Sequence, residues 1–184
     1  YEIYQITVAS GATLNVNANL YLYGGWLSCG GTCNVAAGAS IVGAGGTTNP
    51  GAISLGGTLT NNGQLLLGAG DPGGALFINA GGQLYNYGNI EVAGHDDLLV
   101  QGWLQNYGLL RVLGATTVNV LGTLNNYATG AGIFLYGSLI RQPTGSLTNA
   151  PSAEIYLFNT AVGDHGHMWL ALGNTFTNQG TIEV

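Results

Sequence analysis

Hydrophobic and polar residues alternate with a period of two through most of the chain, and Asn and Gly interrupt this alternation at short intervals. Such alternation is typical of a β-strand with one buried face, and helical spacing is not sustained anywhere. Because the alternating runs are short, the pattern predicts many short strands joined by tight corners. We therefore expect an all-β protein.

The corners belong to an internal repeat with the pattern GxLxNxGx[IL]x[VL], which is complete in "GQLYNYGNIEV" from Gly82. Copies begin at Gly25, Gly57, Gly82, Gly102, Gly122, Gly145 and Asn174. The shortest spacing between copies is 20 residues, from Gly82 to Gly102 and again to Gly122. The copies from Gly122 and Gly145 carry a few extra residues after the Asn, which predicts bulged corners.

A repeat of about 20 residues predicts a β-solenoid, in which each coil pairs with the next through parallel strands about 4.8 Å apart. Short β-rich runs between the copies, such as "ALFIN" from Ala75 and "TVNVLG" from Thr117, supply a third strand to each coil. We expect residues 1–184 to form a single β-solenoid domain of about eight coils, with a less regular N-terminal part over residues 1–50.

Stacking of equivalent positions predicts three inward-facing rows and explains the Gly after each Asn. The first apolar row is Leu27, Leu59, Leu84, Leu104, Leu124, Leu147 and Phe176. The second apolar row is Leu65, Ile90, Leu110, Ile133, Ile155 and Ile182. The amides predicted to hydrogen-bond along the axis are Asn61, Asn86, Asn106, Asn126, Asn149 and Asn178. The Gly that follows is expected to supply a positive φ.

Some outward positions also repeat. Tyr87, Tyr107 and Tyr127 share one position in successive copies, which predicts a surface aromatic stack. The stack is interpreted either as ladder filling or as a binding platform. Arg111 follows Glu91 at another outward position, which predicts an axial salt bridge rather than a catalytic pair.

The only two cysteines, Cys29 and Cys33, stand on either side of one tight corner in the copy from Gly25. The repeat places both sulfur atoms on the inward side. Two buried thiols and a disulfide that staples the corner both fit this placement, and an oxidising compartment favours the disulfide.

Composition narrows the function classes. Only 5% of residues are charged, Lys is absent and the net charge is −6, so no basic stripe is present for nucleic acid. No apolar stretch approaches the roughly 20 residues of a membrane-spanning helix. Because the chain begins with Tyr1, we expect a mature, exported chain from which a leader was removed. The expected location is extracellular or at the cell surface.

The sequence shows no catalytic constellation. Its eight acidic residues are scattered, and no Ser-His-Asp order, P-loop or dinucleotide fingerprint is present. We therefore expect no enzymatic activity and no cofactor.

Histidines occur in two segments that are expected to be loops. Asp164, His165 and His167 in "GDHGH" either hold a divalent metal or form a polar insert, and the sequence leaves this open. Asp96 and Asp97, beside His95, offer oxygen ligands for Ca²⁺, but the nonapeptide repeat that binds calcium in some β-helices is absent.

Neither end of the repeat shows a polar cap, which a monomeric solenoid normally needs. The residues expected at the assembly interface are Tyr1, Ile3, Ile6, Val8, Phe176, Ile182 and Val184. Docking of one end on the opposite end of an identical subunit is a heterologous contact, which generates an open filament. The first residues of one chain are expected to complete the last coil of its neighbour by strand addition.

The GxLxNxGxI units resemble the β-solenoid repeats of secreted adhesins and autotransporter passengers, and the cap-free form resembles a subunit of a prokaryotic extracellular filament. This resemblance implies a role in surface attachment, biofilm formation or cell-to-cell contact. The expected function is a structural subunit that polymerises with identical subunits. The alternative is a secreted adhesin or carbohydrate-binding module that binds surface glycans or other cells through the Tyr87 to Tyr127 row or the loop near Trp169. An enzymatic or ice-binding solenoid is a third hypothesis, although regular TxT rows are not evident.

Overall fold

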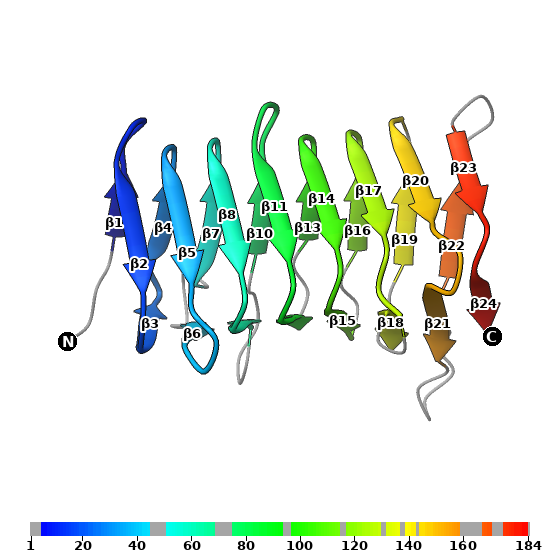
Figure 1. Cartoon of the computed structure of the whole chain (residues 1–184), viewed down its shortest axis with the longest axis horizontal. Helices are drawn as coiled ribbons and strands as arrows, with labels where there is room; N and C mark the ends of the chain where they lie inside the picture. The colour runs from blue at the N-terminus through cyan, green and yellow to red at the C-terminus, as the bar shows by residue number, and fades with distance from the viewer. Residues whose placement is uncertain are drawn as a thin grey trace.

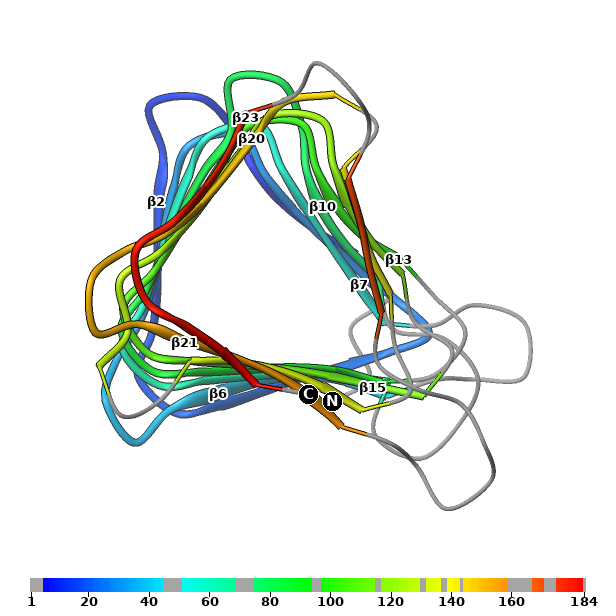
Figure 2. The ribbon, with the colours of Figure 1, turned by 90° about the vertical axis from the view of Figure 1, so that its right-hand side faces the viewer.

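The structure is a computed structural model that describes residues 5–44, 51–68, 75–93, 97–114, 117–129, 132–136, 139–142, 144–158, 167–170 and 175–183. These residues form a β-solenoid whose coils stack along one axis, with the first and last coils at opposite ends (Figure 1). Viewed along that axis, the three sides close into a triangle (Figure 2). The predicted all-β solenoid is therefore confirmed.

Each side of the triangle is one parallel sheet of eight strands, and each coil contributes one strand to each sheet. Sheet A contains, in spatial order, β1 (Gln5–Val8), β4 (Trp26–Cys29), β7 (Ala52–Leu55), β10 (Ala75–Ile78), β13 (Asp97–Val100), β16 (Thr117–Val120), β19 (Leu139–Gln142) and β22 (His167–Leu170). Sheet B contains β2 (Thr13–Val16), β5 (Thr32–Val35), β8 (Thr58–Asn61), β11 (Gln83–Asn86), β14 (Trp103–Asn106), β17 (Thr123–Asn126), β20 (Ser146–Asn149) and β23 (Thr175–Asn178). Sheet C contains β3 (Asn19–Tyr23), β6 (Ser40–Ala44), β9 (Gln64–Leu67), β12 (Asn89–Ala93), β15 (Leu109–Leu113), β18 (Ile133–Tyr136), β21 (Glu154–Phe158) and β24 (Thr181–Glu183).

The spacing of the turns varies because inserts lie at the corners. Successive turns are about 23 residues apart, and the 20-residue turn occurs where Trp103 pairs with Gln83 on one side and Thr123 on the other. After Asn126 the corner is wider, and Thr129 forms an isolated antiparallel bridge with Ala153. The bulged corners predicted for the looser copies are therefore present in the described residues.

The core consists of inward rows that run the length of the solenoid. In sheet B the register aligns Leu59, Leu84, Leu104, Leu124, Leu147 and Phe176. In sheet C it aligns Leu65, Ile90, Leu110, Ile133, Ile155 and Ile182. Most of these side chains are fully buried, so both predicted rows are confirmed from the copy at Gly57 onward.

The prediction for Leu27 is wrong. Leu27 lies in β4 of sheet A, where it pairs with Ile6 and Ile53. The Cys corner joins sheets A and B, whereas the Asn-x-Gly corner of the later copies joins sheets B and C. The copy from Gly25 is thus displaced by one side of the triangle, and Cys33 occupies the row position below Leu59.

The Gly after each ladder Asn has a different role from the one predicted. Gly63, Gly88 and Gly108 do not have a positive φ. A Cβ atom on Gly88 would instead collide with the carbonyl oxygen of Gly63, and one on Gly108 would collide with that of Gly88. These corners need Gly because the backbones of successive coils stack in direct contact.

Candidate functional site

The two end coils carry the sheet edges of the described chain. β1, β2 and β3 are the first strands of the three sheets, and β22, β23 and β24 are the last. Among the described strands, each of these six has a neighbour on one side only. Such edges present backbone N–H and C=O groups that can pair with another strand.

The structure places four of the predicted interface residues in these end coils. Ile6, Phe176 and Ile182 are only partly buried, whereas Val8 is buried. The interior members of the same rows are almost all fully buried. Tyr1, Ile3 and Val184 lie outside the described residues. The rows thus become accessible to solvent at both ends, because no further described coil covers them.

Buried amides form the predicted ladder at the corner between sheets B and C. Asn61, Asn86, Asn106, Asn126 and Asn149 are all 0% exposed. Each Nδ2 donates to the Oδ1 of the next Asn towards the C-terminus at 2.7–2.9 Å, and the last acceptor is Asn178. Most of these amides also donate to a backbone carbonyl oxygen of the next coil, as Asn86 does to Leu109 at 3.0 Å.

The ladder is directional and links the coils through the core. All of its amide hydrogen bonds run the same way, so the Oδ1 of Asn61 is free of the ladder and accepts from the backbone N–H of Gly63 at 3.2 Å. At the other end, Asn178 is exposed. Buried polar groups are costly unless they are paired, so the ladder stabilises one register of the coils.

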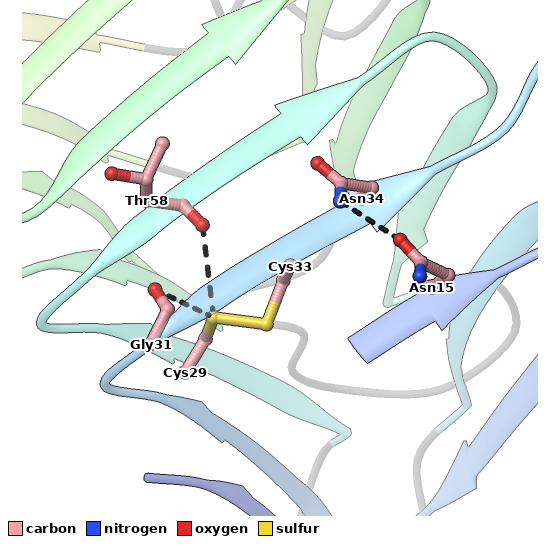
Figure 3. Close-up of a disulfide and its surroundings, with 6 residues drawn as sticks. All are labelled: Asn15, Cys29, Gly31, Cys33, Asn34 and Thr58. Atoms are coloured by element: carbon pink, nitrogen blue, oxygen red, sulfur yellow. Dashed lines mark hydrogen bonds between the residues drawn. A yellow bond between two sulfur atoms is a disulfide. The ribbon is translucent and has the colours of Figure 1, made fainter. Parts of the chain in front are cut away.

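The corner between β4 and β5 is stapled by a disulfide between Cys29 and Cys33 (Figure 3). Both sulfur-bearing side chains are fully buried, and the Cα atoms are 6.5 Å apart. The sulfur of Cys29 also lies 3.7 Å from the carbonyl oxygen of Gly31 and 3.8 Å from that of Thr58. The disulfide interpretation is confirmed, and the buried-thiol alternative is excluded.

Tyr87, Tyr107 and Tyr127 form the predicted surface stack beside the Asn ladder. Their ring centroids are 5.0 and 5.1 Å apart, and the rings are nearly parallel. Burial raises the pKa of the Tyr107 hydroxyl, and the neighbouring Tyr87 and Tyr127 raise this pKa further because adjacent phenolates repel. Within the row the ring faces cover one another, so solvent meets mainly ring edges and hydroxyl groups. A sugar ring that packs on an aromatic face would find such a face only at the ends of the row.

The outer face of sheet C carries features that the sequence analysis found only in part. The predicted Glu91–Arg111 ion pair is present, with 3.7 Å between Oε2 and Nη1. It borders a shallow depression of about 180 Å³ that Gln64, Leu66 and Leu109 also line.

Next to this ion pair lies an aromatic cluster that sequence reasoning missed. Phe134 and Tyr156 stack at 4.7 Å, and Tyr136 and Phe158 stack at the same distance. The Tyr156 hydroxyl donates to Glu154 at 2.8 Å, and this hydrogen bond raises the pKa of the Tyr156 phenol. The signal was available, because these four residues alternate with inward residues around Ile133 and Ile155, which the predicted row had already identified.

The histidine segments are only marginally described. His95, Asp96, Asp164 and His165 lie outside the described residues. For Asp97 and His167 the structure gives only the strand position, at the starts of β13 and β22. Within the described ranges no group of three or more His, Cys, Asp or Glu side chains could hold a metal ion. The metal alternative for the "GDHGH" segment therefore stays a prediction.

No helix in the described part of the chain is long and apolar enough to cross a membrane. Comparison with protein-family models, curated proteins and solved structures found no match to this chain.

Proposed function

We propose that this chain is a structural subunit that associates head to tail with identical subunits, so that the last coil of one subunit continues into the first coil of the next and an extracellular filament forms. The observation that carries this proposal is the parallel order of all three sheets, which leaves three accessible edges at each end of the described chain. A contact between opposite ends is heterologous and repeats without closing.

The residues of the two end coils match when the internal register is continued across the joint. Extending sheet B would place Leu14 of the next subunit on Phe176, since both occupy the same inward row. Extending sheet C would place Leu20 on Ile182 by the same rule. These side chains are only partly buried in the single chain. Apolar residues would therefore meet apolar residues in both sheets, and burial of this surface favours association.

The Asn ladder is also compatible with such a joint. Asn149 donates to Asn178 and to the carbonyl oxygen of Thr181 in the following coil. In a continued register, Asn19 of the next subunit takes the position that follows Thr181 in sheet C. The Nδ2 of Asn178 would then find the carbonyl oxygen of Asn19 as an acceptor, so docking would not leave this amide buried without a partner.

The proposed location outside the cell is supported by the disulfide, because such bonds persist in oxidising compartments. With two Arg and no Lys, the chain lacks the basic residues that nucleic-acid binding needs. Its acidic residues are scattered along the sequence, which supports a structural rather than an enzymatic role. Attachment, biofilm formation and cell contact remain proposals that follow from the resemblance alone.

The test is negative-stain electron microscopy together with sedimentation velocity on the chain of residues 1–184. We expect fibres that grow by about 38 Å per subunit, since eight strands per sheet stack at about 4.8 Å. Phe176→Lys should leave isolated rods, because it places a charge in an apolar row at the joint. Thr177→Lys, at the outward neighbouring position of β23, should still polymerise. A wild-type chain that stays monomeric at high concentration would refute the proposal.

A further inference from the structure

The outer face of sheet C is chemically unlike that of sheet B. The outward positions of sheet B carry mainly Thr, Asn, Ser and Gln. One outward row of sheet C runs, in order along the axis, Tyr21, Val42, Leu66, Glu91, Arg111, Phe134, Tyr156 and Glu183. Most of this row is apolar, although it lies on the surface of the described chain.

The two charged residues of this outward row that pair with each other, Glu91 and Arg111, lie at its centre. Sheet C has eight strands, and its midpoint lies between β12 and β15. Glu91 is in β12 and Arg111 is in β15. The only oppositely charged pair in the row therefore straddles the centre of the sheet.

From this arrangement we propose that sheet C pairs face to face with sheet C of a second copy of the chain, with the two solenoid axes antiparallel. A two-fold axis through the midpoint, parallel to the strands, brings β12 of one copy opposite β15 of the other. Glu91 of each copy then faces Arg111 of the other copy. An isologous contact of this kind is the usual geometry of a symmetric dimer.

The rest of the row is complementary under the same rotation. Leu66 lies opposite Phe134, and Val42 lies opposite Tyr156, so aliphatic side chains meet aromatic ones. Tyr21 lies opposite Glu183, where a phenol can donate to a carboxylate. The adjacent row includes Leu113 and Tyr136. Continuing the register of β9 by one residue beyond Leu67 brings Gly68 opposite Tyr136. The small residue leaves room for the large ring.

A parallel arrangement of two copies fails the same comparison. With the axes parallel and in register, Glu91 faces Glu91 and Arg111 faces Arg111, so like charges oppose each other. These charges are partly exposed, at 28% and 49% respectively. Juxtaposed like charges are unfavourable across an interface, which selects the antiparallel arrangement.

A second copy fits this face better than a glycan chain does. The rings of Phe134 and Tyr156 are stacked on each other, so they present edges rather than open faces. Rows of edges at the strand spacing can interdigitate with rows of the same spacing, and two packed sheets lie about 10 Å apart. A second copy supplies such rows along the whole contact.

The area of the outer face of sheet C indicates how strongly two single subunits would pair through it. Eight strands span about 38 Å, and four or five residues across span about 15 Å, giving a flat area of about 600 Å². Stable complexes bury about 800 Å² per partner. Two single subunits should therefore pair weakly, whereas two filaments should pair firmly because the contact recurs at every subunit.

Charge reversal and mixing provide the test. Glu91→Arg alone and Arg111→Glu alone should each abolish pairing, because both leave like charges across the midpoint. An equimolar mixture of the two single variants should restore pairing, since each copy then supplies the charge that the other needs. Neither single variant regains its internal ion pair, so restoration reports an intermolecular contact. Asn125→Arg and Asn125→Glu on sheet B are matched controls, and circular dichroism checks that each variant folds.

The readouts are side-by-side pairs in electron micrographs and the dimer fraction in sedimentation velocity. Each reversal should lower the dimer fraction at least tenfold, and the sheet B controls should leave it unchanged. Wild-type chains that stay single at all concentrations, or a mixture that does not recover pairing, would overturn the proposal. Glycan binding that is lost on Tyr156→Lys, in a chain that does not self-associate, would assign the face to a sugar instead.

This inference fails independently of the proposed function. Filaments that remain single would refute sheet C pairing and leave head-to-tail assembly intact. Dimers of a Phe176→Lys chain that no longer polymerises would support sheet C pairing alone.

Discussion

Replacing Asn106 by Leu removes the centre of the buried amide ladder while keeping the number of side-chain heavy atoms and the branching at Cγ. Asn106 accepts from Asn86 at 2.7 Å and donates to Asn126 at 2.9 Å and to the carbonyl oxygen of Gly108 at 3.0 Å. Asn86, Asn106 and Asn126 are all 0% exposed, so water cannot replace the hydrogen bonds that Asn106 makes. Asn106→Leu therefore leaves polar atoms of both neighbours without their ladder hydrogen bond.

The expected loss follows from these contacts. A buried polar group left without its partner costs about 1–3 kcal/mol. The Oδ1 of Asn126 loses its ladder donor, whereas the Nδ2 of Asn86 keeps the carbonyl oxygen of Leu109 at 3.0 Å. The added apolar surface of Leu offsets about 1–2 kcal/mol. The free energy of unfolding should fall by about 2 kcal/mol on balance.

Denaturant unfolding of the non-polymerised chain, followed by circular dichroism, measures this change in the free energy of unfolding. Asn178→Leu at the exposed end of the ladder is the matched control, because it removes one ladder hydrogen bond outside the buried row. We expect its effect to stay below about 1 kcal/mol. If Asn106→Leu unfolds at the same denaturant concentration as the wild type with an unchanged slope, the ladder does not stabilise the coils and the reasoning is wrong.

Three further changes test other parts of the solenoid. Gly88→Ala should destabilise by about 1–3 kcal/mol because its Cβ meets the carbonyl oxygen of the previous corner, whereas Gly56→Ala, with open space around it, should be tolerated in the same thermal unfolding assay. Reduction of the Cys29–Cys33 disulfide should lower the free energy of unfolding by about 2 kcal/mol, as expected for so short a loop, in denaturant curves with and without reductant. The folded chain raises the pKa of the Tyr107 hydroxyl. The contribution of the neutral Tyr107 phenol to the free energy of unfolding is therefore complete below about pH 10 and is lost as the pH rises through the folded pKa. Spectroscopic phenol titration of the wild type and of Tyr107→Phe can follow this change.

The repeat made most of the core predictable. A period-two pattern identifies which residues share a face, and a constant spacing between copies identifies which residues stack. The rows through Leu84 and Ile90 and the ladder through Asn86 could therefore be assigned without coordinates. The axial pair of Glu91 and Arg111 followed from the same register.

Two errors show what a linear pattern does not contain. The copy from Gly25 keeps the spacing of the repeat, with Cys29 in the Asn position and Cys33 in the second apolar position, yet it folds around a different corner of the triangle, because the identity of a corner depends on how many strands precede it. The role of Gly88 depends on the distance between stacked backbones, which no single coil specifies. The aromatic cluster around Phe134 was missed for a related reason, since the outward row through Glu91 and Arg111 was not followed into the looser copies, where Phe134 and Tyr156 continue it.

The inward rows of apolar and Asn side chains, rather than ion pairs, determine the register in which the coils stack. With only 5% charged residues, few ion pairs are available to select one arrangement of the coils. A slip of one residue in sheet B would turn Asn106 outward and bring Trp103 or Gln105 into the core, which would break the ladder and leave polar or oversized groups buried. The same penalty would apply at a joint between subunits, because Phe176 meets Leu14 only when the internal register is continued. The rows that align the coils within one chain would thus also align one chain with the next, and in the proposed pairing the sparse charges at Glu91 and Arg111 would select how two solenoids pack side by side.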